Sequence, residues 1–457
     1  EDTLSIYSNM RFNSFTSSLI LFLSLLVSET IAQTVYFKQE IDFKGKIQSL
    51  FVDEEDPKLF VIDSKYLRTF YLKDRASFVR SNLKGFQKKK LLGYSSSEGS
   101  DMTLYFEGKD NTFEFVVLKK GYQSLPNGLL NLTISNNEFY LTGLTHNKVF
   151  YILTITKNSS VLNFYPFREF VGDSKIMFDL SSQMKGESLY RKLIKTYISS
   201  AVFSLSNKPQ LEKVDDSIIA NKWESINFSK LYSEGSYVNI SLDYNEQNTE
   251  LISISLEDST FSVTKIPYPG SYCSSGSYKV NNNTNSFIYN DHLYQTRQCP
   301  DTIKISLKSL SGDLVKEWIV TEDTERRIPT DYYGLEFLQD MSTKRAIRKI
   351  SKLNAGIVVQ NDSDEFQFLV GGQQEAYELT NYNQGVTETE SGWITLAVNN
   401  DFEDLDHRVV TSFDKLQNYK NLQYSIKFPY HFKLNRELYF SYYYQYKKYL
   451  TNVKAEK

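Results

Sequence analysis

The sequence predicts an all-β fold, specifically a β-propeller of about seven four-stranded blades. Two observations lead to this prediction: a hairpin pattern that returns every 45 to 54 residues, and an aromatic composition of 33 Tyr and 31 Phe against 3 Trp. Tyr and Phe favour the half-buried, pleated surface of strands. The length of 457 residues also exceeds that of one ordinary core, unless the fold is a repeat or a large all-β domain.

Each hairpin consists of two runs in which apolar and polar residues alternate, joined by a turn rich in Asn, Asp, Gly or Ser. Alternation with period two indicates half-buried strands, and those four residue types suit tight turns. The hairpins start at Leu59, Leu104, Tyr151, Val202, Leu251, Ile303 and Ile357.

Two units carry a further hairpin ahead of the recurring one. Leu132–Ile134 is followed by Phe139–Leu141, and Phe287–Tyr289 is followed by Leu293–Gln295. Two hairpins per unit make a four-stranded antiparallel sheet, and closing such sheets into a ring hides their edges. The alternative is tandem β-sandwich domains, because the spacing drifts and no fixed signature marks each unit.

The predicted domain organisation follows from where the repeat is recognisable. We expect the propeller over residues 33–380, and a last blade or a C-terminal β extension over residues 381–457. Within the latter, Trp393–Val398 is predicted to be a strand. Leu438–Tyr444 is predicted to be a final strand tied to the first blade.

Two segments interrupt the β pattern with helical spacing. In the first, Leu189, Leu193 and Ile198 define an apolar face, and Lys192 and Lys195 are expected opposite to it. The second covers residues 341–353, with basic residues alternating with Ala346, Ile347, Ile350 and Leu353. It is read as a short surface helix packed on a blade edge, with a basic membrane-surface helix as the alternative.

The N-terminal residues 1–32 have the features of a signal peptide. Met10 and Arg11 precede the apolar run Leu19–Val27, and small residues stand at the −3 and −1 positions before Gln33. Cleavage is predicted between Ala32 and Gln33, and residues 1–9 are interpreted as a start-codon artefact. The apolar run is shorter than the ~20 residues that span a bilayer, so no transmembrane anchor is expected in the mature chain.

The chain has two cysteines, Cys273 and Cys299. In an oxidising compartment such a pair usually forms a disulfide, and this is the prediction. Two separate buried thiols are the alternative.

Catalytic residues are not recognisable. His146, His292, His407 and His431 stand alone, without the spacing of a zinc site. Carboxylates cluster at Asp53–Asp56, Asp362–Glu365 and Asp401–Asp406, but none matches a calcium loop, so calcium is the one ion left open and no cofactor is expected. The net charge of −3 argues against a nucleic-acid partner.

The composition, the junction Ile31–Gln33 and the segments Asn285–Gln295 and Ile303–Leu307 resemble those of uncharacterised secreted or envelope proteins of Bacteroidetes-type bacteria, with a propeller-like pattern. The resemblance is specific over residues 285–320. It implies an envelope location, periplasmic or associated with the outer membrane, and it implies no activity.

Two functions remain open at this stage. The first is a non-catalytic binding or scaffold protein of the cell envelope, which uses one face or the central channel of the propeller to bind an envelope protein or a glycan. The alternative is an extracellular carbohydrate-active enzyme that uses channel carboxylates.

Overall fold

The structure is a computed structural model, and strands dominate it. It describes residues 35–41, 49–53, 58–62, 66–71, 77–83, 85–86, 89–96, 102–109, 112–118, 127–168, 170–184, 186–195, 208–214, 225–270, 273, 283–323, 342–362, 365–378, 386–399, 401–403, 430–434, 437–444 and 447–453.

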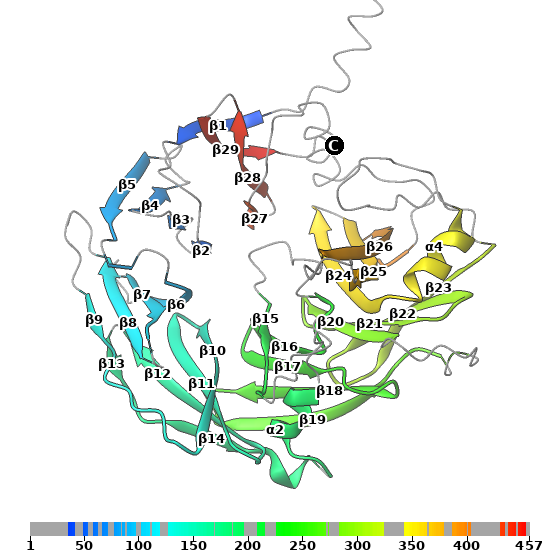
Figure 1. Cartoon of the computed structure of the whole chain (residues 1–457), viewed down its shortest axis with the longest axis horizontal. Coiled ribbons are helices and arrows are strands. Elements are labelled where there is room, and N and C mark those ends of the chain that lie inside the picture. The colour runs from blue at the N-terminus through cyan, green and yellow to red at the C-terminus, as the bar shows by residue number, and fades with distance from the viewer. Residues whose placement is uncertain are drawn as a thin grey trace, which may run out of the picture. The chain divides into compact units, whose positions relative to one another are not determined.

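The chain divides into two compact units (Figure 1). The terminal unit consists of Glu1–Asp42, Val410–His431 and Glu437–Lys457, and the main unit of Phe43–Val409 with Phe432–Arg436. The predicted signal peptide, with Ala32 and Gln33, lies outside the described residues.

The terminal unit contains a sheet that takes strands from both ends of the chain. Its order is β1 (Val35–Ile41), β29 (Lys447–Val453), β28 (Glu437–Tyr444) and β27 (Tyr430–Leu434). The first strand, β1, is antiparallel to β29, the last. The predicted final strand Leu438–Tyr444 corresponds to β28, and it reaches the first strand through β29.

The main unit begins with three sheets in chain order. The first contains β2 (Ser49–Asp53), β3 (Lys58–Ile62), β4 (Tyr66–Tyr71) and β5 (Ser77–Asn82). The second contains β6 (Leu91–Ser96), β7 (Met102–Glu107), β8 (Phe113–Leu118) and β9 (Asn127–Leu129). The third contains β10 (Glu138–His146), β11 (Val149–Thr156), β12 (Val161–Arg168), β13 (Val171–Gly172) and β14 (Ile176–Asp179).

Three more sheets complete the main unit. One contains β15 (Glu212–Lys213), β16 (Ser229–Glu234), β17 (Tyr237–Leu242), β18 (Asn248–Ser255) and β19 (Thr260–Pro267). The next contains β20 (Thr284–Tyr289), β21 (His292–Gln298), β22 (Thr302–Ser309) and β23 (Leu314–Thr321). The last contains β24 (Asn354–Asp362), β25 (Glu365–Glu378) and β26 (Val386–Asn399).

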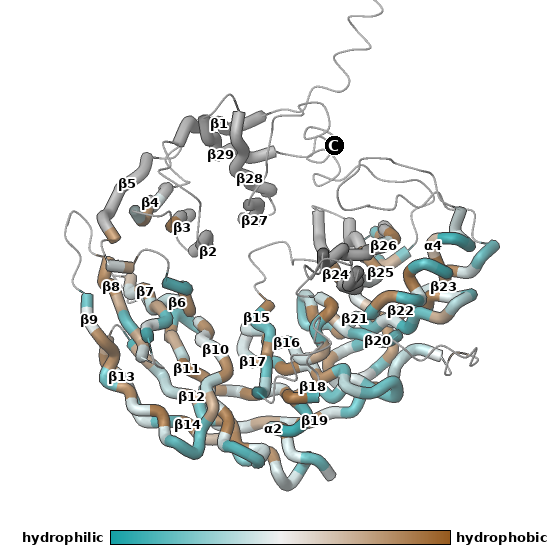
Figure 2. Tube along the Cα trace, viewed as in Figure 1, coloured by the Kyte–Doolittle hydropathy of each residue, from teal (hydrophilic) through white to brown (hydrophobic). Residues whose placement is uncertain are grey.

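Successive sheets of the main unit share apolar cores. One core is built from β11, β12 and β14 on one side and β16–β18 on the other. Another joins β18 and β19 to β20–β23 and then to β24–β26. Each sheet therefore buries its faces against its neighbours in the chain, and short brown and teal stretches alternate along the strands in Figure 2. This is the organisation of a β-propeller, and the predicted fold class is confirmed.

One predicted hairpin is wrong, and another lies largely outside the described residues. The unit predicted from Val202 begins in residues 201–207, which are outside the described part, and its end contains β15, which runs parallel to β16 and belongs to the sheet β15–β19. Residues 131–135 form no strand, because the backbone N–H of Leu132 donates to the carbonyl of Leu130 instead of to a neighbouring strand. The predicted boundary at residues 380 and 381 falls between β25 and β26, which pair with each other.

The hairpin predicted from Phe287 to Gln295 is confirmed as β20 and β21. Its turn residues, Asn290 and Asp291, have φ values of 49° and 56°. Asn and Asp tolerate this left-handed conformation, which the right-handed twist of a two-residue hairpin requires.

Both predicted helices are present. They are α2 (Leu189–Lys195), which follows the short 3-10 helix η2 (Leu180–Ser182), and α4 (Thr343–Ile350). Ala346, Ile347 and Ile350 of α4 are buried in the core that the sheets β20–β23 and β24–β26 share. The apolar face of α4 is thus used inside the protein, as expected for a surface helix packed on a blade. No helix in the described part of the chain could span a membrane.

Candidate functional site

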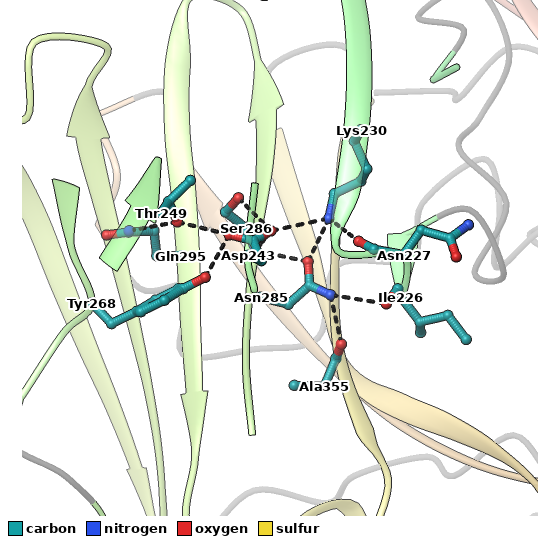
Figure 3. A network of polar contacts seen from close by, with 10 residues as sticks. All are labelled: Ile226, Asn227, Lys230, Asp243, Thr249, Tyr268, Asn285, Ser286, Gln295 and Ala355. Atoms are coloured by element: carbon teal, nitrogen blue, oxygen red, sulfur yellow. Dashed lines mark hydrogen bonds and ion pairs between the residues drawn. The ribbon is translucent and has the colours of Figure 1, made fainter. Parts of the chain in front are cut away.

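Charged and polar side chains gather in the interior where β16, β18 and β20 meet (Figure 3). Lys230 lies near the start of β16, Asp243 directly follows β17, and Asn285 and Ser286 lie near the start of β20. All four are buried. Ions and amides are costly to bury unless they are hydrogen-bonded, so their partners decide what this network does.

The ammonium group of Lys230 is fully enclosed, with 0% of the side chain exposed. It donates to the carbonyl oxygen of Asn227 at 2.5 Å and to Oδ1 of Asn285 at 2.6 Å, and it lies 3.3 Å from Oδ2 of Asp243. Burial lowers the pKa of Lys230, and the Asp243 carboxylate opposes that shift. Three acceptors therefore match the three protons of the ammonium group.

The carboxylate of Asp243 accepts hydrogen bonds at both oxygens. Oδ1 accepts from Oγ1 of Thr249 at 2.8 Å and from the hydroxyl of Tyr268, while Oδ2 accepts from the backbone N–H and the hydroxyl of Ser286 at 3.1 and 2.9 Å. Burial raises the pKa of Tyr268, and the charge of Asp243 adds to it. Tyr268 therefore stays a neutral donor.

Asn285 extends the network to a third sheet. Its Nδ2 donates to the carbonyl oxygen of Ala355 on β24 at 2.8 Å and to that of Ile226 at 3.3 Å (Figure 3). Nε2 of Gln295 donates to Oγ1 of Thr249 at 3.0 Å and so links β21 to β18. The network joins the sheets β15–β19, β20–β23 and β24–β26 at one place.

The connection from β19 to β20 is held by two further contacts close to this network. The predicted disulfide is present, with 2.02 Å between the sulfur atoms of Cys273 and Cys299. Arg297 on β21 donates from Nε to the carbonyl oxygen of Pro269 at 3.0 Å and from Nη2 to that of Glu246 at 2.8 Å. Pro269 and Cys273 are therefore tied to the sheet β20–β23.

A second buried ion pair corrects the prediction for α2. Lys192 was expected opposite the apolar face, but its side chain is 3% exposed and its Nζ lies 2.5 Å from Oε2 of Glu250 on β18. Lys192 follows Leu189 by three residues, which places it on the same side of the helix. Burial alone would raise the pKa of Glu250, but hydrogen bonds from Lys192 and Tyr244 lower it overall.

The histidines are not brought together among the described residues. His146 is buried at the end of β10, where its Nδ1 lies 3.1 Å from the hydroxyl of Ser233 on β16. His292 begins β21, and its Nδ1 lies 2.6 Å from the carbonyl oxygen of Asn290. His407 lies outside the described residues, and only the backbone of His431 is described.

Glu212 on β15 differs from the carboxylates of the network. Burial raises its pKa, and Lys90, which precedes β6, opposes that shift. A raised carboxyl pKa is what a general acid requires, although structural carboxylates show the same effect. Glu212 carries no signal of its own in the sequence, because it stands within an alternating run like any other strand residue.

The carboxylate clusters proposed for calcium are only partly visible. Asp401 and Glu403 are exposed, and their backbone N–H groups donate to Oδ1 of Asn399 at 3.0 and 2.8 Å, which makes this segment an ordinary turn. Side chains of Asp53–Asp56 and Asp362–Glu365 lie outside the described part. In the parts of the chain with described side chains, no group of three His, Cys, Asp or Glu residues is placed to hold a metal ion.

No protein-family model matches this chain, and no curated protein matches it. The solved structures that are similar include β-propeller proteins of diverse functions. The WD40 domain of SCAP from fission yeast shows 7% identity and a TM-score of 0.33, with 90% of this chain and 84% of that chain covered. An N11 neuraminidase-like protein of a bat influenza A virus shows 8% identity and a TM-score of 0.32, with 82% and 96% covered.

A protein of unknown function from Bacteroides caccae shows 8% identity and a TM-score of 0.27, with 76% of this chain and 92% of that chain covered. The chain spans about half the length of two other matched structures, a dihydro-heme d1 dehydrogenase and a prolyl endopeptidase, at 47% of each. Likenesses this distant carry no argument about function.

Proposed function

We propose that this chain is a non-catalytic binding or scaffold protein of the cell envelope, exported by cleavage between Ala32 and Gln33. It binds an envelope glycan or protein through the loops beside the buried network. The Cys273–Cys299 disulfide supports export, because disulfides persist in oxidising compartments.

One observation carries the proposed binding role. Cys273 and Pro269 are tied to the sheet β20–β23 by the disulfide and by Arg297, and the neighbouring sheets are joined by Lys230, Asp243 and Asn285. These charges are saturated by partners within the protein and form a rigid frame. A rigid frame lowers the ordering cost of binding and so favours recognition by the loops that it carries.

The experiment uses the disulfide-intact full chain and a panel of soluble envelope polysaccharides. Isothermal titration measures binding, and a reducing-end assay on the same mixtures measures hydrolysis. We expect saturable binding without an increase in reducing ends. Steady release of reducing ends would contradict the non-catalytic role. If no polysaccharide of the panel binds, none of these glycans is the ligand.

Export is tested separately. The full chain is expressed in a bacterial host, and the periplasmic protein is analysed by intact mass. We expect a mature chain that begins at Gln33. A chain that stays in the cytoplasm and still contains residues 10–32 would contradict the proposed location.

Glu212 favours a second candidate function, an extracellular carbohydrate-active enzyme. Its raised pKa suits a general acid, but glycoside hydrolysis also needs a second carboxylate at a defined distance. In the reducing-end assay, Glu212→Gln would abolish hydrolysis if Glu212 were the acid. Glu317→Gln is a matched control, because it makes the same chemical change at an exposed position of β23.

A further inference from the structure

The edge strand β23 exposes apolar side chains. It is the last strand in the order β20-β21-β22-β23, and Leu314, Val315 and Ile319 are 59%, 48% and 55% exposed. Trp318 and Val320 on the same strand are buried in the core shared with β24–β26. Trp318 and Val320 thus pack β23 against the protein, while the side chains of Leu314, Val315 and Ile319 are exposed to a partner.

An edge strand also offers backbone N–H and C=O groups to a further strand. The edge of the neighbouring sheet is shielded at one point, because the backbone N–H of Val263 on β19 donates to Oε1 of Gln183 at 2.8 Å. On β23 the exposed apolar side chains accompany an edge with which no strand of the described residues pairs. Apolar side chains on an edge are typical of strands that accept a partner strand.

The charges of β23 argue against a second copy of this chain as the partner. In a symmetric antiparallel pair of two copies, the two-fold axis passes midway between one residue and the same residue of the other copy, so that these two residues lie opposite each other. If β23 of one copy pairs along nearly its whole length with β23 of a second copy, the pair is centred on Glu317 or on Trp318. The first register sets Glu317 against Glu317, and the second sets Lys316 and Glu317 against apolar residues, both of which are unfavourable.

A different peptide can satisfy the same charges. Directly opposite residues on antiparallel strands lie on one face of the sheet, about 5 Å apart. An acidic residue opposite Lys316 and a basic residue opposite Glu317 would form two cross-strand ion pairs. An apolar residue opposite Ile319 would cover that exposed side chain, while Val315 lies at a β-bulge where the register with β22 shifts.

We propose that β23 docks an extended peptide, which adds to the sheet as its next antiparallel strand. The peptide carries a basic residue opposite Glu317 and an acidic residue opposite Lys316, with an apolar residue opposite Ile319. This site is on a sheet edge and is independent of the binding role proposed for the loops, so either proposal can fail alone.

Fluorescence anisotropy with a labelled synthetic peptide tests the proposal. The probe is Thr-Val-Thr-Lys-Glu-Val-Leu, which lies antiparallel to β23 with its Lys opposite Glu317 and its Glu opposite Lys316, and its Val-Leu end extends past the bulge at Val315. One control peptide exchanges its Lys and Glu. The other keeps every side chain but carries N-methyl groups on alternate amides, which cannot donate to a strand. We expect saturable binding of the probe, at least tenfold weaker binding after the charge exchange, and loss of binding after N-methylation.

Two variants of the full chain locate the site. Ile319→Lys is expected to weaken binding at least tenfold. Val171→Lys, at a 58% exposed apolar position on β13, is expected to leave it unchanged. Thermal unfolding checks that both variants remain folded, and Ile319→Ala is used if Ile319→Lys does not fold.

Three results would overturn the proposal. The first is that the probe does not bind. The second is that the N-methylated peptide binds as well as the probe, which would indicate a non-specific apolar patch. The third is a dimer in sedimentation velocity that Ile319→Lys dissociates, which would identify a second copy as the occupant.

Discussion

His146 at the end of β10 and Ser233 on β16 connect two neighbouring sheets, with 3.1 Å between Nδ1 and the hydroxyl oxygen. The Ser233 hydroxyl also donates to the carbonyl oxygen of Thr145 at 2.8 Å. Since that bond uses its one proton, Nδ1 of His146 is the donor to Ser233. Thr145 in turn bonds to Tyr94 on β6 through its side chain, so three sheets meet at this point.

The His146 contact predicts a pH-dependent stability. Burial lowers the pKa of His146, and a hydrogen bond with the Ser236 backbone opposes that shift. The unfolded chain takes up this proton more readily, so the contribution of His146 is present above about pH 6.5 and is lost as the pH falls. Urea unfolding of His146→Gln at about pH 7.5 and pH 5.5 is expected to show a smaller loss of stability on acidification than the unsubstituted protein. An equal loss in both proteins would contradict this assignment.

The buried Lys230 predicts a large effect of a neutral substitution. Lys230→Met removes the cation and leaves the Asp243 carboxylate enclosed without its counter-charge. We expect a loss of about 3 to 5 kcal/mol in the free energy of unfolding, measured by urea denaturation. Asp243→Asn should lower the free energy of unfolding less in the Lys230→Met variant than in the unsubstituted protein, because the charge that it removes is already unpaired there. Additive losses would show that the two groups do not interact.

Two lysines of α2 provide a matched comparison. Lys192 and Glu250 are both buried, whereas Lys195 pairs with Glu187 at 2.6 Å with 61% of its own side chain exposed. Lys192→Met is expected to destabilise the protein by about 3 kcal/mol, since the buried Glu250 then keeps only the 54% exposed Lys265 as a cationic partner. Lys195→Met should change stability by less than about 1 kcal/mol, since exposed pairs are screened by water. Similar losses for both would place Lys192 at the surface.

The disulfide predicts a measurable stabilisation. Cys273 and Cys299 are 26 residues apart in the sequence, and closing a loop of this length contributes about 3 kcal/mol in the chain-entropy model. The Cys273→Ser and Cys299→Ser double variant should unfold at lower urea concentration by a corresponding amount. Dithiothreitol should destabilise the unsubstituted protein and leave the variant unchanged. Sensitivity of the variant to the reductant would point to another cause.

Local signals in the sequence predicted much of the fold. The alternation and the turn residues from Phe287 to Gln295 predicted β20 and β21, because a tight turn between two alternating runs is encoded by consecutive residues. The same reasoning did not show where the end of the segment from Val202 to Val214 would pair. There the pairing partner of β15 is β16, reached only after an intervening segment, and strand alternation does not show which strand is the neighbour.

The candidate site could not be predicted in the same way. Lys230 and Asn285 are 55 residues apart, and each stands in an ordinary alternating strand. Lys192 appeared to lie on the polar side of α2, because a lysine is normally solvated and its carboxylate partner is 58 residues further along the chain. Pairing between such distant residues is set by which sheets become neighbours.

The amino-acid sequence by itself determined that this chain forms short antiparallel sheets in succession, because strand period and turn chemistry depend on residues a few positions apart. It also supplied the two cysteines that bond. Only the tertiary structure decided that Lys230, Asp243 and Asn285 are enclosed together and that Leu314, Val315 and Ile319 of β23 are exposed. Burial is a property of the packed sheets, and the free energy of a charge or an apolar side chain depends on what the neighbouring sheet places against it.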